Sequence, residues 1–354
     1  MIFEPFRLER WLLKNADNDL GGGGVIKLKL GQVLDSIDPD HLLKYGNTCG
    51  SDSLRIMVAD WYGVEPENVL ITSGTSEANL LVNLAILKPR NYYVSENPCY
   101  EQTKRFAETL GAQTVMFNLI EEDNWKPDLE GLKNIRHKTT MIFLVNPNNP
   151  TGAVLSSQEL SSIIEIAEDF DAYLHCDNAL RGSELDGKPA PVPYPEYDKG
   201  IVTGSISKLG ATSPRIGWIV ADSNLIERFW VVKDYTTLGH SGLGEYIAEK
   251  ILRQKEHLIE RNLKISHKNL RILDDWIECR PDFYWNVPEA GFTGFPGYNL
   301  DYSSKELCED ILKEKGLLLS PGEFFGVENH IRVNIGSTEQ NLREGLERIE
   351  NFLE

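Results

Sequence analysis

The chain has 354 residues, of which 41% are hydrophobic and 25% charged, a composition typical of a soluble globular protein with about two domains. Its net charge of −18 would repel phosphate backbones, which argues against a nucleic-acid partner bound through a basic face. The sequence contains no run of 18 apolar residues, so it predicts no membrane span, and its N-terminus lacks the pattern of a signal peptide.

The cysteines and histidines also limit the class of protein. Cysteine occurs at five scattered positions without a CxxC pair: Cys49, Cys99, Cys176, Cys279 and Cys308. Such a pattern favours reduced thiols and a cytoplasmic location over a disulfide framework or a zinc site. The seven histidines show no metal-ligand spacing, so we expect no metal site.

From about residue 69, short apolar runs alternate with segments of helical periodicity. Strands are predicted over residues 69–72, 91–95, 113–117, 140–145, 172–176 and 200–203. Helices are predicted from 76 to 87, where Pro89 stops the helix, and from 102 to 110. A further helix has one apolar face formed by Leu160, Ile163, Ile164 and Ala167. This alternation favours a mainly parallel sheet covered by helices on both faces.

Beyond about residue 222 the pattern changes to long charged helices. Residues 243–277 would link the first core to a second lobe. Strands are then predicted over 283–285, 317–319 and 331–335, and an amphipathic helix with Leu342, Leu346, Ile349 and Phe352 ends the chain. Near the N-terminus, the glycine run 21–24 is interpreted as a flexible hinge, because no helix opens after it to form a phosphate site.

Polar residues follow several predicted strands at their carboxyl ends, where open α/β sheets bind ligands. Residues 73–76, Ser-Gly-Thr-Ser, open a helix and suit a phosphate, although such residues are also common helix caps. In residues 146–152 two prolines fix a bend, and Asn149 offers an amide donor to an oxyanion. Asp177 ends the next strand, where a carboxylate suits either a turn or a protonated ring nitrogen.

Lys208 follows a predicted buried strand and small hydroxyl residues. A lysine in a confined site loses its proton more readily and forms a Schiff base with a carbonyl. A solvated lysine in a strand-to-loop turn is the ordinary alternative, and this segment alone does not decide between them.

These segments together carry a resemblance that covers nearly the whole chain. The matching pieces, in chain order, are Tyr45 and Gly50; residues 73–78, 97–100 and 146–152; Asp177 and Ala179; Ser205, Ser207 and Lys208; Arg215 and Gly217; and residues 320–326 and 331–333. The chain resembles the fold-type I pyridoxal-phosphate enzymes of the class I/II aminotransferase family, and the pieces keep the family's order.

The resemblance implies an α/β fold with a mainly parallel, seven-stranded sheet and a smaller α/β domain. The large cofactor-binding domain would cover residues 40–260. The small domain would be formed by both termini, residues 1–39 and 261–354. The implied cofactor is pyridoxal 5′-phosphate, and the implied assembly is a homodimer.

The resemblance also implies the catalytic roles. Lys208 would form the Schiff base with the cofactor and then move the proton from the substrate α-carbon. Asp177 would keep the cofactor's ring nitrogen protonated, so that the ring accepts electrons. Asn149 would donate to the phenolic oxygen of the ring.

Further implied roles concern binding of the cofactor and the substrate. The phosphate would be held by Gly74, Thr75, Ser76, Ser205 and Arg215. Tyr100 would stack on the ring, and Tyr45 would reach the phosphate from the second subunit. Arg332 would bind the substrate α-carboxylate through two parallel hydrogen bonds, and Gly31 would bring backbone close to the substrate.

The chain departs from the family pattern at two positions. Leu180 stands where the family usually has a tyrosine that donates to the phenolic oxygen, so a donor worth about 1–3 kcal/mol is lost unless another residue replaces it. We therefore expect either a raised pKa of the Schiff base or a substitute donor. The spacer from Lys208 to Arg215 is one residue shorter than usual, which predicts a remodelled phosphate loop.

The leading interpretation is an aminotransferase that moves an amino group between an amino acid and a 2-oxo acid by a ping-pong mechanism. A lyase, decarboxylase or cyclase would use the same cofactor with another outcome. A non-catalytic sensor of the same fold is disfavoured because Lys208, Asp177, Asn149 and Arg332 are all present. A nucleotide-dependent dehydrogenase would need a GxGxxG motif after its first strand, which is missing. The amino donor and acceptor are left open.

Overall fold

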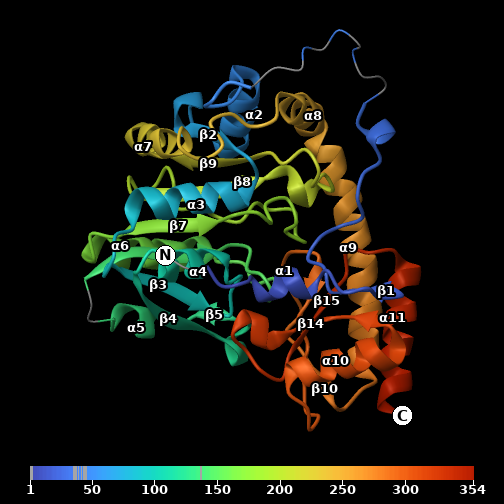
Figure 1. Cartoon of the computed structure of the whole chain (residues 1–354). Helices are drawn as coiled ribbons and strands as arrows, with labels where there is room; N and C mark the ends of the chain where they lie inside the picture. Colours follow the sequence, from blue (N-terminus) through green and yellow to red (C-terminus); the bar gives the residue numbers. More distant parts are fainter. Residues whose placement is uncertain (1–2, 35–37, 39, 41, 43–45, 136–137) are drawn as a thin grey trace.

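A twisted central sheet organises the molecule (Figure 1). The computed structural model describes residues 3–34, 38, 40, 42, 46–135 and 138–354. The strands of the sheet, from one edge to the other, are β2 (Val69–Thr72), β9 (Gly217–Ala221), β8 (Gly200–Ser205), β7 (Tyr173–Asp177), β6 (Thr139–Val145), β3 (Tyr92–Asn97), β4 (Gln113–Ile120) and β5 (Lys126–Pro127). The strands predicted from the apolar runs are therefore confirmed, with ends that differ by a few residues.

Most neighbouring strands of this sheet are parallel, as predicted. Strands β8, β7, β6, β3 and β4 run parallel, whereas β9 is antiparallel to both β8 and β2. The prediction of seven strands is one short, because the two-residue strand β5 extends the sheet beyond β4. A pairing of two residues leaves no apolar run or alternation in the sequence, so periodicity could not have indicated it.

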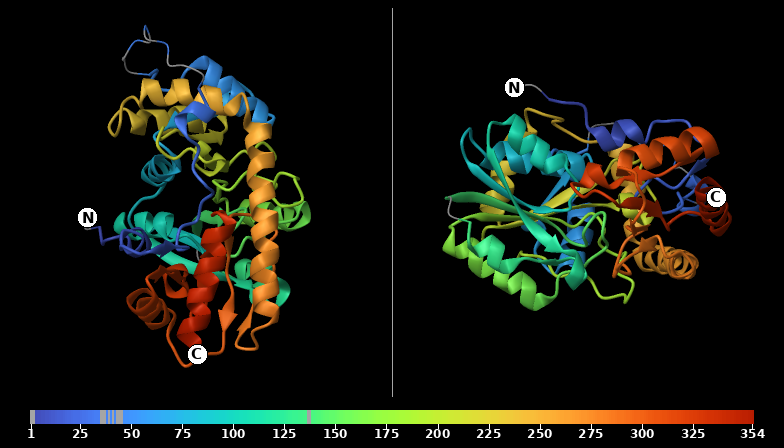
Figure 2. Two further views of the ribbon diagram at one scale, coloured as in Figure 1. Left: turned by 90° about the vertical axis from the view of Figure 1, so that its right-hand side faces the viewer. Right: turned by 90° about the horizontal axis from the view of Figure 1, so that it is seen from below.

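The sheet is buried on both faces, because alternate residues of its strands point to different helix layers. In β9, Ile219 packs with α3 (Thr75–Ile86), α4 (Gln102–Thr109) and α7 (Ser223–Lys233). Its neighbour Trp218 packs on the other side with α2 (Asp52–Tyr62) and α8 (Gly242–Leu252), and α6 (Ser157–Asp169) covers the same side further along. The right-hand view of Figure 2 shows helices on both sides of the sheet.

A segment near the N-terminus packs with the C-terminal part of the chain beside this sheet. Strand β1 (Asn18–Asp19) pairs with β13 (Leu317–Leu318), and β15 (Ile331–Asn334) lies between β11 (Thr293–Gly294) and β14 (Ser320–Pro321). The other elements of this part are α1 (Arg7–Trp11), β10 (Phe283–Tyr284), β12 (Gly297–Tyr298), α10 (Ser304–Lys315) and α11 (Glu339–Leu353). The boundaries expected for a large and a small domain stay a prediction.

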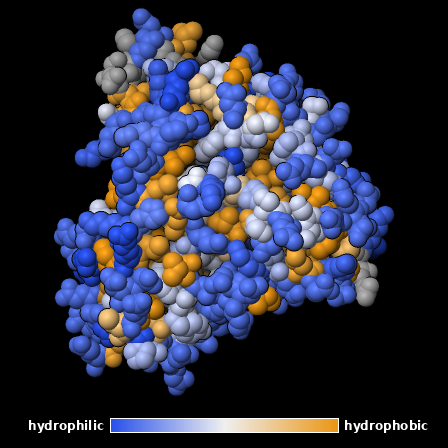
Figure 3. Space-filling model, turned by 180° about the vertical axis from the view of Figure 1, so that it is seen from behind, coloured by the Kyte–Doolittle hydropathy of each residue, from blue (hydrophilic) through white to orange (hydrophobic). Residues whose placement is uncertain are grey.

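The long charged segment after residue 242 forms two helices. Helix α8 ends at Leu252, and α9 runs from Lys255 to Glu278 along one side of the molecule (Figure 2). The remaining helix, α5 (Leu129–Lys133), packs against α6. No helix within the described ranges has the length and apolar character that crossing a membrane requires. The face opposite to that of Figure 1 is largely hydrophilic at its rim (Figure 3).

Gly217 on β9 lies directly beneath the start of α3. A Cβ atom at this position would lie 2.5 Å from the carbonyl carbon of Gly74, 2.7 Å from the carbonyl oxygen of Gly204 and 2.7 Å from the amide nitrogen of Thr75. All of these are backbone atoms, which cannot move aside as a flexible side chain would. Glycine at 217 therefore allows the loop before α3 to rest on the sheet.

We expect Gly217→Ala to lower the free energy of unfolding by about 1–3 kcal/mol, because overpacking forces the backbone to shift. Urea unfolding followed by circular dichroism measures this change. Gly31→Ala is the control, since a Cβ there meets no atom within 4 Å. Equal stability of the two variants would show that the packing beneath Gly74 is loose.

Candidate active site

A cavity of about 500 Å³ opens at the carboxyl ends of β2, β6, β7 and β8, facing α1 and β15. Its polar and charged lining residues include Glu9, Thr75, Ser76, Asn79, Tyr100, Gln102, Asn149, Asp177, Ser205, Ser207, Lys208, Thr212, Arg215 and Arg332. The carboxyl ends of parallel strands share one edge of a sheet, which explains why residues from distant loops converge here.

Asp177 is the last residue of β7 and is buried at the base of this cavity. Its Oδ2 accepts a hydrogen bond from Asn79 Nδ2 at 2.9 Å, and its Oδ1 accepts one from the Ala179 amide at 3.0 Å. Burial raises the pKa of this carboxyl group, whereas both donors and the positive charge of Lys208 oppose that rise. The donors therefore stabilise a buried carboxylate and fix its direction.

Asn79 is a cavity residue that sequence reasoning missed. Its Oδ1 accepts from Thr203 Oγ1 at 2.7 Å, and this hydroxyl lies 3.2 Å from His175 Nε2. A buried chain of hydrogen bonds thus runs from β7 and β8 through α3 to Asp177. A signal was present, because Asn79 follows Thr75 by four residues and therefore shares its face of the helix.

Lys208 lies in the short 3-10 helix Ile206–Leu209, which follows β8. Its Nζ donates to the carbonyl oxygen of Gly23. The pKa of Lys208 is lowered to about 8, mainly by burial and also by the positive charges of Arg332 and Lys27, while Asp177 and Glu9 act in the opposite direction. An amine with this pKa is partly neutral near pH 7, as a nucleophile toward a carbonyl must be.

The glycine run 21–24 contacts the cavity rather than acting only as a hinge. The carbonyl of Gly21 accepts from Arg332 Nη2 at 2.6 Å, and a Cβ at Gly23 would lie 3.2 Å from Arg332 Nη1. Gly31, in contrast, is exposed in the 3-10 turn Leu30–Gln32 and does not line the cavity. The backbone that lines the cavity near the expected substrate position therefore belongs to Gly23 and not to Gly31.

Arg332 projects from β15 and is buried. Its Nη1 donates to Asn149 Oδ1 at 3.1 Å, its guanidinium lies 4.8 Å from the centre of the Phe325 ring, and its Nε has no hydrogen-bond partner among the described residues. Burial lowers the pKa of Arg332 to about 10, so the group stays cationic at neutral pH. A buried cation with an unused donor suits a carboxylate ligand.

The loop before α3 and Arg215 form a place for an anion. Arg215 donates to the carbonyl oxygens of Thr212 at 3.3 Å and of Ser73 at 3.4 Å. A Cβ at Gly74 would collide with the guanidinium, so the missing side chain lets Arg215 approach. Thr75 Oγ1 is buried without a hydrogen-bond partner among the described residues. These donors at the positive end of α3 fit a phosphate group.

Tyr100 and Leu180 form walls of the cavity. The hydroxyl of Tyr100 donates to Glu9 Oε1 at 2.8 Å, and burial raises the pKa of Tyr100 well above its usual range. Leu180 is buried and packs against Val25 and Phe292. The position where the family usually has a tyrosine hydroxyl is therefore an apolar contact.

The structure brings together nearly all of the described residues that the sequence indicated. Thr75, Ser76, Tyr100, Asn149, Asp177, Ser205, Lys208, Arg215 and Arg332 line the same cavity, and Gly74 is the N-cap of α3. Tyr45 lies outside the described residues. Within the described ranges, no group of at least three His, Cys, Asp or Glu side chains is placed to hold a metal ion.

The cavity fits the cofactor that the resemblance implies. Pyridoxal 5′-phosphate has a phosphate, a ring nitrogen and an aldehyde, which need an anion site, a carboxylate and an amine. The buried Thr75 Oγ1 without a partner, the buried Asp177 carboxylate and the Lys208 amine supply these in one cavity.

Comparisons with known proteins agree with this geometry. The model of the family "Aminotransferase class I and II" matches residues 20–349. A crystal structure of a PLP-dependent aminotransferase from Streptococcus suis 89-1591 is 32% identical, covers 100% of this chain and 98% of that chain, and superposes with a TM-score of 0.94.

Two curated relatives extend the comparison. The capreomycidine synthase of Streptomyces vinaceus is 28% identical over 98% of this chain and 93% of that protein. The (5-formylfuran-3-yl)methyl phosphate transaminase of Methanocaldococcus jannaschii is 29% identical over 99% and 97%, respectively. The chain therefore belongs to the class I and II aminotransferase family, and it is a fold-type I enzyme with pyridoxal 5′-phosphate as its cofactor.

Proposed function

We propose that the enzyme transfers an amino group from an amino acid to a 2-oxo acid in two half-reactions through this cavity. The observation that carries the proposal is the convergence on one cavity of Asp177 from β7, Arg332 from β15 and Lys208 from the 3-10 helix that follows β8. When bound, pyridoxal phosphate supplies an aldehyde carbon and a ring that accepts electrons from the substrate α-carbon.

Each residue has a task that follows from its surroundings. Lys208 Nζ would hold the cofactor through its aldehyde and would move the proton at the substrate α-carbon. Asp177 keeps a proton on the ring nitrogen, and Asn149 Nδ2 donates to the phenolic oxygen, because its Oδ1 is taken by Arg332. Arg332 binds the substrate α-carboxylate, which orients the α-carbon toward Lys208.

The remaining binding roles complete the proposal. Tyr100 stacks on the ring, and the phosphate is held by Gly74, Thr75, Ser76, Ser205 and Arg215. A homodimer in the cytoplasm is part of the proposal, with Tyr45 of one subunit reaching the phosphate of the other. Its support is the resemblance in residues 45–50 and the cysteine pattern of the sequence.

Two observations favour a second candidate function, in which the same cofactor supports a lyase, decarboxylase or cyclase. Leu180 removes a hydroxyl that the family usually places near the ring. One of the relatives is named as a synthase rather than an aminotransferase. A lyase or cyclase would also use Lys208 to remove the α-proton, whereas in a decarboxylase carbon dioxide would leave instead and Lys208 would return a proton to the α-carbon. The orientation of the substrate bond relative to the ring decides between these outcomes.

The experiment that tests the proposal is a screen of single half-reactions. Amino acids are added one by one to the cofactor-loaded enzyme, and the conversion of bound aldehyde to bound amine is followed by absorbance. We expect an equimolar 2-oxo acid with the best donor, and no conversion with Lys208→Ala. Release of ammonia, carbon dioxide or a cyclised product without a 2-oxo acid would replace the proposal by the second candidate.

The pH dependence of cofactor attachment follows from the lowered pKa of Lys208. Only the neutral amine attacks the aldehyde, so the attachment rate should rise about tenfold per pH unit and level off above about pH 8. Arg332→Met should move the midpoint upward, because the variant lacks a cation that disfavours protonation of Lys208. Stopped-flow absorbance of the apoenzyme measures both. A midpoint near the ordinary lysine value of 10.5 would contradict the assignment.

Asn79→Ala should lower kcat about tenfold or more, because it removes a donor to the buried Asp177 carboxylate. The loss of this donor raises the pKa of Asp177, so the acid limb of the kcat–pH profile should move to higher pH. Thr203→Val, which removes a hydroxyl bonded to Asn79 and His175 rather than to Asp177, should show a smaller change of the same sign. Unchanged profiles in variants that unfold at the wild-type temperature would show that the chain of hydrogen bonds is only structural.

A further inference from the structure

One charged side chain of the cavity has no task in the proposed reaction. The charged lining residues are Glu9, Asp177, Lys208, Arg215 and Arg332. Four of these serve the ring nitrogen, the aldehyde, the phosphate and the substrate α-carboxylate. Glu9 alone is unassigned, and its charge is negative.

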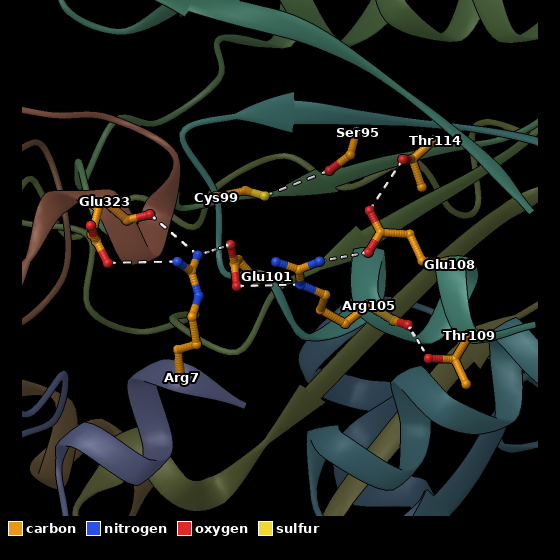
Figure 4. A network of polar contacts seen from close by, with 9 residues as sticks. All are labelled: Arg7, Ser95, Cys99, Glu101, Arg105, Glu108, Thr109, Thr114 and Glu323. Carbon is orange, nitrogen blue, oxygen red and sulfur yellow. Dashed lines mark hydrogen bonds and ion pairs between the residues drawn. The ribbon is translucent and has the colours of Figure 1, made fainter. Parts of the chain in front are cut away.

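Glu9 lies at the mouth of the cavity, and residues before and after it in the chain attach its helix to the protein. Arg7 forms an ion pair with Glu101 at 2.8 Å and another with Glu323 at 3.6 Å (Figure 4). Trp11 Nε1 donates to the carbonyl oxygen of Leu319 at 2.6 Å. These contacts attach helix α1 to the rest of the protein beside the cavity, which restricts the positions of the Glu9 carboxylate.

The carboxylate of Glu9 is anchored but not neutralised. Its Oε1 accepts the hydrogen bond from Tyr100 at 2.8 Å, and within the described residues it has no basic partner at 4.0 Å or less. Its negative charge favours the protonated forms of Tyr100, Lys208 and Arg332, so its field reaches the reaction centre. The side chain of Glu9 is exposed, so its carboxylate is accessible to the cationic end of a ligand in the cavity, and such an ion pair contributes up to about 1 kcal/mol.

We propose that Glu9 determines specificity for amino acids whose side chain ends in an ammonium or guanidinium group. With the α-carboxylate on Arg332, the side chain extends along Leu8, Leu12 and Leu180, and its terminal cation pairs with Glu9. This inference rests on the proposed function, and it names the substrate class of that site.

The charged residues that line the cavity also disfavour amino acids with an acidic side chain. An acidic substrate would need a second cation for its distal carboxylate, and the lining cations Lys208, Arg215 and Arg332 already have tasks. Its distal carboxylate would instead face Glu9, and two like charges at close range repel.

The test uses pairs of amino acids that differ mainly in the terminal charge. Lysine is compared with norleucine, and arginine with citrulline. Each pair is measured in the half-reaction of the cofactor-loaded enzyme and in equilibrium absorbance titrations, both at about pH 7.5. The variant is Glu9→Gln, whose side-chain oxygen still accepts from Tyr100. Glu4→Gln is the control, since it removes a charge from the same segment outside the cavity lining.

We expect the wild type to prefer the charged member of a pair, and Glu9→Gln to reduce this preference by about two- to fivefold, the effect of an exposed ion pair. Glu4→Gln should keep it. An equal loss for charged and neutral members would show that Glu9 only fastens α1, and a wild type that prefers neutral or acidic donors would also overturn the inference. If no amino acid converts the bound aldehyde, the proposed function fails instead, and the titrations still report whether Glu9 selects cations.

Discussion

The enzyme depends on the burial of one amine beside other cations. Lys208 lies in the 3-10 helix after β8, in a cavity that also contains Arg332, and burial together with that positive charge lowers its pKa to about 8. A buried cation is costly, so the neutral form becomes accessible. Asp177 stays ionised in the same cavity because its carboxylate accepts hydrogen bonds from Asn79 and from the Ala179 amide. The surrounding protein residues thus favour a neutral amine at Lys208 and an ionised carboxylate at Asp177.

Much of this arrangement was predictable from the sequence, because its signals are local. Apolar runs indicated the strands, and the residues after them, such as Asp177 and Lys208, lie where parallel strands end. The edge of the sheet then brings these residues together without further information. Arg332 was indicated only by the family resemblance, since it comes from the C-terminal part of the chain.

The parts that were missed arise from contacts between distant segments. Gly23 comes near Lys208 across 185 positions, and Glu9 meets Tyr100 across 91. Neither segment has a periodicity that indicates a partner. No helix opens after the glycine run, so its sequence predicts only a hinge, and the family resemblance points to Gly31 rather than to Gly23. Asn79 was overlooked because a buried asparagine in a helix has no motif of its own, although its spacing from Thr75 places it on the cavity side.

The most direct test of the account locates the covalent bond. The cofactor-loaded enzyme is reduced with borohydride, digested and mapped by mass spectrometry. The account predicts a pyridoxyl group on the peptide that contains Lys208, and none on that peptide when an amino acid donor has first converted the cofactor to its amine form. A stable adduct on another lysine, such as the neighbouring Lys27, with Lys208 unmodified, would contradict it.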